Sequence, residues 1–116
     1  MAMTIILQDS SGNQEKILEV SVRAEEWEQD CYQVGCSVAK EVAIRVLESM
    51  EEQLFGDHPK GWRVKGHRSR QVAALFGEMT VRRRLYQDED GKYHFLLDEH
   101  LNWRPYQKAA NAPRQD

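Results

Sequence analysis

The stretch RQVAALFGEMTVRRRLY, residues 70–86, decides the fold of this 116-residue chain. Residues 70–76 and 79–86 have the two-residue periodicity of β-strands, and the pair Gly77-Glu78 separates them. Glycine in the first position of a two-residue turn is typical of a type II′ β-hairpin. The stretch therefore predicts two antiparallel strands joined at Gly77-Glu78.

A third strand is expected at residues 93–97, after an acidic turn at residues 88–91, so that the three strands form an antiparallel meander. On the middle strand, alternation places Arg82 and Arg84 on one face and Arg83 on the other. Because Arg83 shares its face with apolar side chains, we expect it to pair with a carboxylate. The apolar surface of the sheet is expected to come from Met79, Val81, Leu85, Tyr93, Phe95 and Leu97.

Upstream of the sheet, residues 24–55 form the strongest helical pattern of the chain, with acidic first turns and Gly56 after the last residue. The apolar residues point in two directions, about 100° apart, that change near Gly35. Either the helix kinks at Gly35, or its halves cover different partners, for example the chain's own sheet and a second subunit. The residues expected to mediate self-association as a homodimer are Trp27, Val34, Val38, Met50 and Leu54.

These patterns predict an α+β fold, in which a long N-terminal helix packs on a three-stranded antiparallel β-meander. The expected segments are an N-terminal β-hairpin or extension (1–23), the amphipathic helix (24–57), the basic β-meander (58–103) and a polar tail (104–116). We expect all of them to form one domain, because a chain of 116 residues can build only one modest core.

Charge is divided unevenly along the chain. The net charge is −3, but residues 1–57 hold twelve acidic and four basic residues, whereas residues 58–86 hold eight basic residues and one acidic residue. Several cationic side chains on one surface can release counterions from nucleic acid, and a β-ribbon fits a major groove. We therefore expect DNA as a partner, unless the arginines form a solvated sheet face that the acidic helix balances. The expected DNA-binding residues are Lys60, Arg63, Lys65, Arg68, Arg70, Arg82 and Arg84.

Residues typical of catalysis or metal binding do not occur in a convincing arrangement. The histidines are scattered, there is no Cys-x-x-Cys, and the acidic turn at 88–91 lacks the spacing of a calcium loop. Asp98 is expected to cap a final helical turn, because no base or nucleophile lies near it in sequence. We expect no enzymatic activity in this chain, no catalytic residue, metal site or cofactor, and no small-molecule ligand.

Long apolar runs are also missing from the sequence. No stretch reaches the 18 or more apolar residues of a membrane-spanning helix, and the first seven residues lack the features of a signal peptide. We therefore expect a cytoplasmic protein without a membrane partner.

Four motifs follow one another in the second half of the chain: GWRVKGHRSR at 61–70, Phe-Gly-Glu at 76–78, Arg-Arg-x-x-Tyr at 82–86 and Leu-Leu-Asp-Glu at 96–99. With these motifs, residues 61–103 resemble the N-terminal region of bacterial insertion-sequence transposases of the ISLre type, a group also catalogued as an uncharacterised protein family. Residues 1–22 match no part of that pattern. The resemblance implies a mobile-element protein of DNA recombination, whose metal-dependent nuclease site of three acidic residues would lie beyond residue 116.

Two classes of function follow from these features. The first is a non-catalytic N-terminal domain, or truncated remnant, of such a transposase that contributes DNA binding or assembly. The second is a small protein-interaction domain that forms homo-oligomers and does not bind DNA. Loss of DNA affinity with rising salt separates the two classes.

Overall fold

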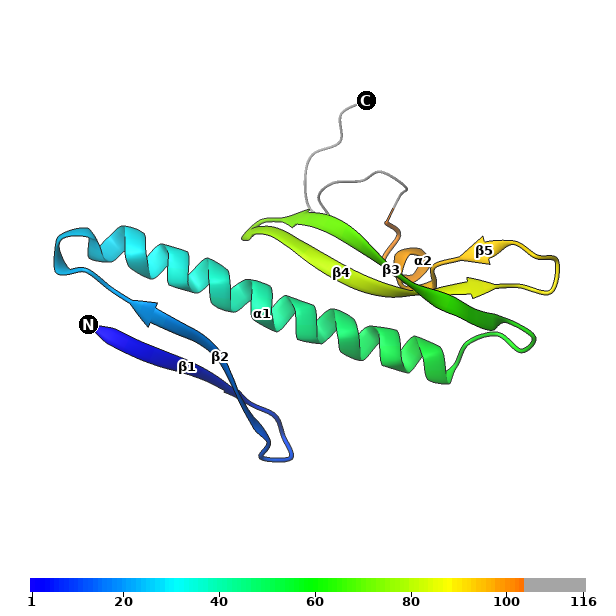
Figure 1. Cartoon of the computed structure of the whole chain (residues 1–116), viewed down its shortest axis with the longest axis horizontal. Helices are drawn as coiled ribbons and strands as arrows, with labels where there is room; N and C mark the ends of the chain where they lie inside the picture. The colour runs from blue at the N-terminus through cyan, green and yellow to red at the C-terminus, as the bar shows by residue number, and fades with distance from the viewer. Residues whose placement is uncertain (104–116) are drawn as a thin grey trace, which may run out of the picture. The chain divides into compact units, whose positions relative to one another are not determined.

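Residues 1–103 are described by the computed structural model, and the expected polar tail at 104–116 lies outside them. The elements are β1 (Ala2–Gln8), β2 (Gln14–Ser21), the 3-10 helix η1 (Ala24–Glu26), α1 (Trp27–Gly56), β3 (Arg63–Ala74), β4 (Gly77–Gln87), β5 (Tyr93–His94) and α2 (Leu96–His100) (Figure 1). Two antiparallel sheets are present, one of β1 and β2 and one in the order β3-β4-β5. The predicted α+β class is confirmed.

The described part of the chain divides into two compact units, Met1–Val42 and a second unit that begins at Ala43. Their boundary falls inside α1, so each unit contains part of this helix. The first unit also holds the β1-β2 hairpin, and the second holds the three-stranded sheet and α2. Among the described residues, every buried apolar side chain belongs to the second unit: Leu47, Val72, Met79, Val81, Tyr86 and Leu97.

The β1-β2 hairpin closes around the side chain of Asp9. Its Oδ1 accepts hydrogen bonds from the backbone N–H groups of Ser11 (2.9 Å) and Asn13 (3.0 Å). This is the turn chemistry that favours aspartate between two strands, and Gly12 supplies the positive φ of 90° that the turn needs. Of the two forms expected for residues 1–23, a β-hairpin or an extension, the structure has the hairpin.

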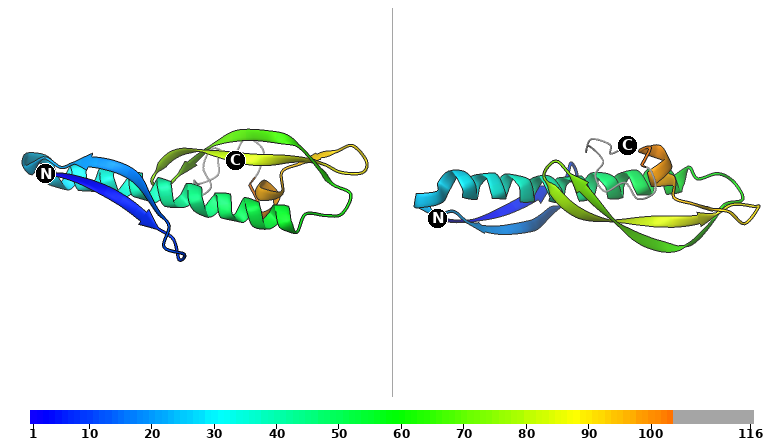
Figure 2. Two further views of the ribbon diagram at one scale, coloured as in Figure 1. Left: turned by 60° about the horizontal axis from the view of Figure 1, so that its bottom comes forward. Right: turned by 90° about the horizontal axis from the view of Figure 1, so that it is seen from above.

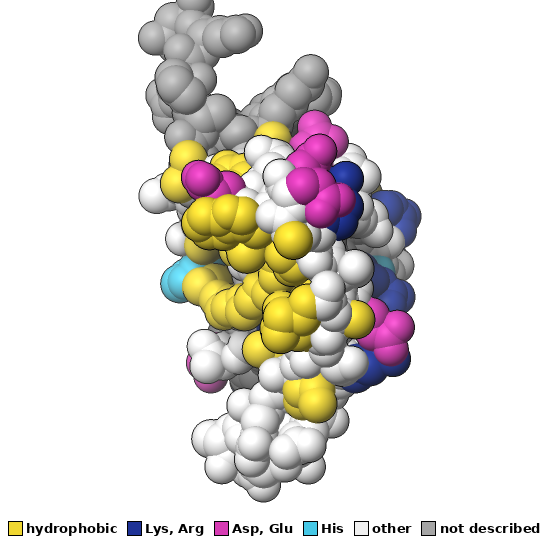
Figure 3. Space-filling model, turned by 90° about the vertical axis from the view of Figure 1, so that its left-hand side faces the viewer, with side chains coloured by type: hydrophobic (Ala, Val, Ile, Leu, Met, Phe, Trp, Pro, Cys, Tyr) yellow, Lys and Arg dark blue, Asp and Glu magenta, His cyan; other side chains and the backbone are white. Residues whose placement is uncertain are grey.

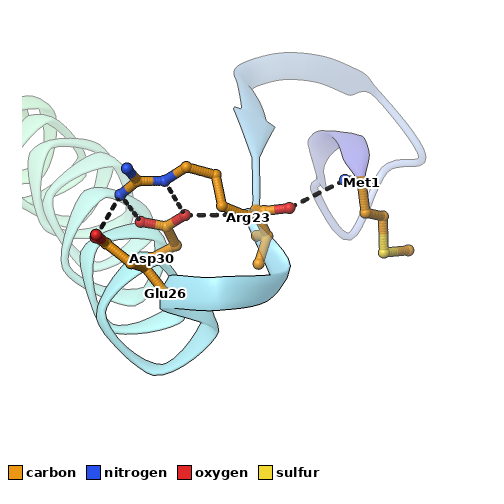
Figure 4. A network of polar contacts seen from close by, with 5 residues as sticks. Met1, Arg23, Glu26 and Asp30 are labelled. Carbon is orange, nitrogen blue, oxygen red and sulfur yellow. Dashed lines mark hydrogen bonds and ion pairs between the residues drawn. The ribbon is translucent and has the colours of Figure 1, made fainter.

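Arg23 links the end of β2 to the beginning of α1 within the first unit (Figure 4). Its guanidinium donates to Asp30 through Nε (3.0 Å) and Nη2 (2.8 Å), and Nη2 also lies 2.8 Å from a carboxylate oxygen of Glu26. The backbone N–H of Arg23 bonds to the same Asp30 carboxylate. Hydrogen bonding by Arg23 lowers the pKa of Asp30 to about 2.

Helix α1 is one continuous helix from Trp27 to Gly56, so the chain stays helical at Gly35 (Figure 1). No side chain packs closely against this glycine, since a Cβ atom there would meet nothing within 4 Å. The C-terminal half of α1 covers the chain's own sheet through Leu47. That the other half covers a second subunit stays a prediction. Met50 and Leu54, which were expected to mediate self-association, instead pack against the core of the second unit.

The turn between β3 and β4 lies two residues earlier than predicted. Ala74 pairs with Gly77, so the two-residue loop is Leu75-Phe76, and the expected turn residues Gly77 and Glu78 belong to β4. Phe76 packs against the core, which favours this register. The turn moves by two residues, which is an even number, so each side chain stays on the face of the ribbon that alternation predicted for it.

The third strand is shorter than predicted. Only Tyr93–His94 pairs with β4, and the chain then turns into α2. This helix carries the fully buried Leu97 into the core. Tyr93 is 60% exposed, so its assignment to the apolar surface of the sheet is wrong. Of the other predicted core residues, Met79, Val81 and Leu97 are buried, and Leu85 and Phe95 are half-buried.

The β3-β4 ribbon is twisted (Figure 2), and the core side chains that it contributes lie on one of its faces. Leu47 of α1 and Leu97 of α2 join Val72, Met79 and Val81 of the ribbon in one apolar cluster. Burying these side chains on one face stabilises the packing of α1 and α2 against the sheet, since fully buried apolar side chains contribute about 1.5–3 kcal/mol each. On the opposite face of the ribbon, Gln71, Thr80 and Arg82 remain exposed.

Candidate nucleic-acid interface

The β3-β4 ribbon presents a row of exposed polar side chains on the face that points away from the core. Ser69 pairs across the strands with Arg82, and Gln71 pairs with Thr80. The Nε2 atom of Gln71 donates a 3.0 Å hydrogen bond to Oγ1 of Thr80. We call this surface the outer face, and its exposed residues are His67, Ser69, Gln71, Glu78, Thr80 and Arg82.

A β-bulge interrupts the strand pairing near the beginning of β3. The pairing passes from Val64–Tyr86 to Gly66–Leu85, which leaves Lys65 without a partner on β4. Bulges bend a strand and re-aim its side chains. The predicted DNA-binding residues that are exposed are Lys60, Arg63, Lys65, Arg68 and Arg82.

Arg70, by contrast, points into the second unit. Its Nη1 lies 2.9 Å from Oδ2 of Asp98, and the same oxygen lies 2.6 Å from Nη1 of Arg83. The Arg83 guanidinium also stacks 3.8 Å from the ring centroid of Phe95. The prediction that Arg83 pairs with a carboxylate is confirmed. The expectation that Arg70 is displayed at the surface is wrong, because its side chain is largely buried in this cluster.

Arg84 is also withdrawn from the surface, which corrects the expectation that it lies exposed beside Arg82. It donates from Nη2 to Glu52 (2.6 Å) and from Nη1 to the backbone oxygen of Glu51 (3.2 Å). Its guanidinium lies 4.3 Å from the ring centroid of Phe55. Only 15% of the side chain remains exposed, because the last turns of α1 cover it.

Glu51 is a buried neighbour of Arg84 that the sequence did not predict. Its Oε1 accepts the backbone N–H of Arg84 at 3.2 Å, on an edge of β4 where β5 provides no pairing. A glutamate on a helix normally indicates a solvated face, so no sequence signal marked it. Burial raises the pKa of the Glu51 carboxyl, and burial likewise raises the pKa of the Tyr86 hydroxyl.

Asp98 does not have the capping role predicted for it. The N-cap of α2 is Phe95, no side chain caps that helix, and Asp98 lies in its first turn. The partners of Asp98 come from strands 15 and 28 residues earlier, so local spacing could not reveal them. Within residues 1–103, no group of three or more metal-ligating side chains occurs.

His94 was also not singled out by its sequence context. Its Nε2 lies 2.8 Å from Oδ2 of Asp88, its Nδ1 lies 3.2 Å from a carboxylate oxygen of Glu99, and its ring stacks on Trp62 at 4.2 Å. Hydrogen bonding to Asp88 raises the pKa of His94, and the same bond lowers the pKa of Asp88. The histidine therefore joins β5, the acidic turn and α2.

Comparison with known sequences places the chain in a family. Residues 17–115 match an uncharacterised protein family, UPF0236, and the chain belongs to this family. It is 30% identical over 96 residues to a protein of Streptococcus gallolyticus described as "UPF0236 protein in vanSb 3′ region". That match covers 82% of this chain and 21% of the relative, so the chain spans about a fifth of the relative's length.

The other comparisons concern fold and membrane insertion. No solved structure matches the chain. Among the helices of residues 1–103, none has both the length and the apolar character needed to span a membrane.

Proposed function

We propose that this chain is the non-catalytic DNA-binding domain of an insertion-sequence transposase, and that another part of such a protein carries out the chemistry. The observation that carries this proposal is the sorting of cations on and around the β3-β4 ribbon. Arg70, Arg83 and Arg84 are neutralised inside the second unit. The five exposed cations form no ion pair with a described residue, and they are Lys60, Arg63, Lys65, Arg68 and Arg82.

Unpaired cations on a ribbon are suited to phosphate contacts. Each Lys or Arg that neutralises a phosphate releases condensed counterions, which is the main source of sequence-independent affinity for DNA. Within residues 58–86, Glu78 is the only acidic residue, so little opposes this attraction. The resemblance of residues 61–103 to transposases supports DNA as the polyanion. Because the remainder of the chain is acidic, we expect weak binding, with a dissociation constant of about 10⁻⁴ to 10⁻⁶ M at physiological salt.

An electrophoretic mobility shift on duplex DNA across a salt series tests the proposal. The double variant Lys65→Ala/Arg68→Ala should weaken binding to every sequence and reduce the magnitude of the salt slope by about two. A matched control, Lys16→Ala/Lys40→Ala, removes the same charge from the first unit and should change binding much less. Unchanged affinity and slope in the first variant, with an intact circular dichroism spectrum, would contradict the proposal.

A second candidate function is self-association through the first unit. This unit has no fully buried side chain, and it exposes large apolar groups such as Trp27 (59% exposed) and Tyr32 (64% exposed). Figure 3 shows hydrophobic side chains gathered on the side of the molecule where α1 begins. A two-stranded hairpin is only marginally stable alone, and a second copy would cover these groups in a symmetric dimer.

Light scattering at high protein concentration tests this second function. We expect a dimer mass that the variant Trp27→Ser/Tyr32→Ser shifts toward the monomer. The matched control is Leu75→Ser, which removes an exposed apolar side chain from the second unit and should leave the mass unchanged. A monomeric mass for the unaltered protein would contradict self-association, whatever the outcome for DNA binding.

A further inference from the structure

We infer that the outer face reads base edges in the major groove of duplex DNA, with Gln71 and Arg82 as the residues that determine specificity. The inference rests on the proposed function, but it adds a sequence preference that phosphate contacts alone do not provide. Base edges carry the sequence information of DNA, whereas phosphates position the protein. The outer face is the part of the ribbon that is both polar and uncovered.

The shape of the ribbon selects the kind of nucleic acid. Two paired strands lie about 4.8 Å apart, and a two-stranded ribbon enters the major groove of B-DNA, which is about 12 Å wide. The major groove of A-form RNA is too deep and narrow for side chains to read. The core covers the inner face through Val72, Met79 and Val81, so only the outer face can meet the bases.

Gln71 is prepared to recognise adenine. One N–H of its amide is directed to Oγ1 of Thr80 at 3.0 Å, which leaves the second N–H and the amide oxygen available. These two groups match N7 and the N6 amino group of adenine in the bidentate pairing that glutamine commonly makes. Thr80 is therefore a positioning residue, since its hydroxyl orients the Gln71 side chain before DNA arrives.

Arg82 is the matching candidate for guanine. It is exposed, and it forms no ion pair with a described residue, so its guanidinium is available for O6 and N7 of guanine. Its cross-strand partner is Ser69, which places it diagonally from Gln71. Diagonal neighbours lie about 7–8 Å apart, which corresponds to about two base-pair steps of roughly 3.4 Å.

The residues around Gln71 and Arg82 are also suited to binding DNA with the outer face in the major groove. Lys65 and Arg68 lie along β3 toward its beginning, where they can contact phosphates beside the groove. At the other end of the outer face, Glu78 pairs with Ala73 close to the turn. A carboxylate there would repel phosphates, but in the groove it can accept a hydrogen bond from the N4 amino group of cytosine.

Selection from a pool of random duplexes, followed by sequencing, tests the inference. We expect enrichment of sites in which a guanine lies about two base pairs from an adenine. Gln71→Ala should remove the preference for adenine, and Arg82→Ala should remove the preference for guanine. In each case the ratio of affinities for the right and the wrong base should fall by roughly 5- to 150-fold. Thr80→Ala should weaken the adenine preference only. Arg82→Lys keeps the charge, so it should lose the guanine preference while retaining the salt slope.

The control is Lys65→Ala, which should weaken binding to all duplexes and leave the enriched sequence unchanged. Binding without any enriched sequence would overturn this inference and leave the proposed function standing. Enrichment that persists in both Gln71→Ala and Arg82→Ala would likewise overturn it, because other residues would then read the bases. If the unaltered protein shows no mobility shift, the proposed function fails and this inference fails with it. Circular dichroism of each variant confirms that the fold is intact.

Discussion

Arg83 donates a 2.6 Å hydrogen bond from Nη1 to Oδ2 of Asp98, and the two side chains are only 9% and 13% exposed. Arg70 reaches the same oxygen from the neighbouring strand at 2.9 Å. One carboxylate on α2 therefore holds one arginine from each of β3 and β4. This cluster attaches α2 to the inner face of the ribbon and removes two cations from the surface that we propose for DNA.

Removing the shared carboxylate should be strongly destabilising. Asp98→Ala leaves two largely buried guanidinium groups without their partner, and breaking a buried ion pair typically costs about 3–5 kcal/mol. We expect a loss of this size in the free energy of unfolding, measured by urea denaturation. Asp90→Ala, at the exposed hairpin tip, is the control and should change stability by less than about 0.5 kcal/mol. A loss below about 1 kcal/mol for Asp98→Ala would contradict a central role for the cluster.

Glu51 offers a test that separates hydrogen bonding from charge. Glu51→Gln keeps an oxygen that can accept the N–H of Arg84 and removes a buried charge, so the free energy of unfolding at neutral pH should not fall. Glu51→Leu leaves that N–H unpaired, which should cost about 1–3 kcal/mol. Urea denaturation of the two variants measures the difference.

The pH dependence at this residue has a defined sign. Because burial raises the pKa of Glu51, its contribution to stability is complete at low pH and falls as the carboxyl ionises in the folded protein. The advantage of Glu51→Gln over the unaltered protein should therefore grow as pH rises from 4 toward 7. Equal stability of the Gln and Leu variants would show that the bond to Arg84 contributes nothing.

His94 and Asp88 should give the protein a stability maximum in mildly acidic solution. The pKa of His94 is raised, so its contribution is complete below the ordinary histidine pKa of about 6.5 and is lost as pH rises through the raised value. The pKa of Asp88 is lowered, so its contribution is complete above about 3.9 and is lost as pH falls through the lowered value. Together the two groups contribute most between about pH 4 and 6.5.

Urea denaturation at pH 5.5 and 8.5 tests this window. The unaltered protein should be less stable at the higher pH, and His94→Gln should remove most of that difference. His100→Gln is a matched control, because His100 is exposed on α2, and it should preserve the difference. A difference unchanged in His94→Gln would assign the pH dependence to other groups.

Asp30 should titrate at an unusually low pH in the first unit. Hydrogen bonds from Arg23 lower its pKa to about 2, and NMR titration of the side-chain carboxyl measures this value directly. Arg23→Gln should move the pKa toward the ordinary aspartate value of about 3.9. Lys16→Gln removes a cation elsewhere in the hairpin and should leave Asp30 unchanged. An ordinary pKa for Asp30 in the unaltered protein would contradict the Arg23 network.

Local periodicity was sufficient to predict the class of fold and the separation of the arginines. The helical period upstream and the two-residue period around residues 70–86 predict α1 and the ribbon, because each depends only on neighbours in the sequence. Alternation on β4 correctly placed Arg83 on the apolar face and Arg82 on the opposite one. Alternation could not predict the position of the β3-β4 turn. Moving the turn by two residues leaves every side chain on the same face of the ribbon, so the alternation is the same for both turns.

Tertiary packing decided which arginines remain available. Arg84 shares the alternation of Arg82, but Glu51 and Glu52 lie 33 and 32 residues earlier in the chain and withdraw it from the surface. Arg70 is likewise held by Asp98, 28 residues away. The alternation of residue types predicts on which face of a strand a side chain lies. Its final partner depends on which distant segment packs beside it, and the burial of Leu47 and Leu97 against the ribbon brings α1 and α2 to these positions.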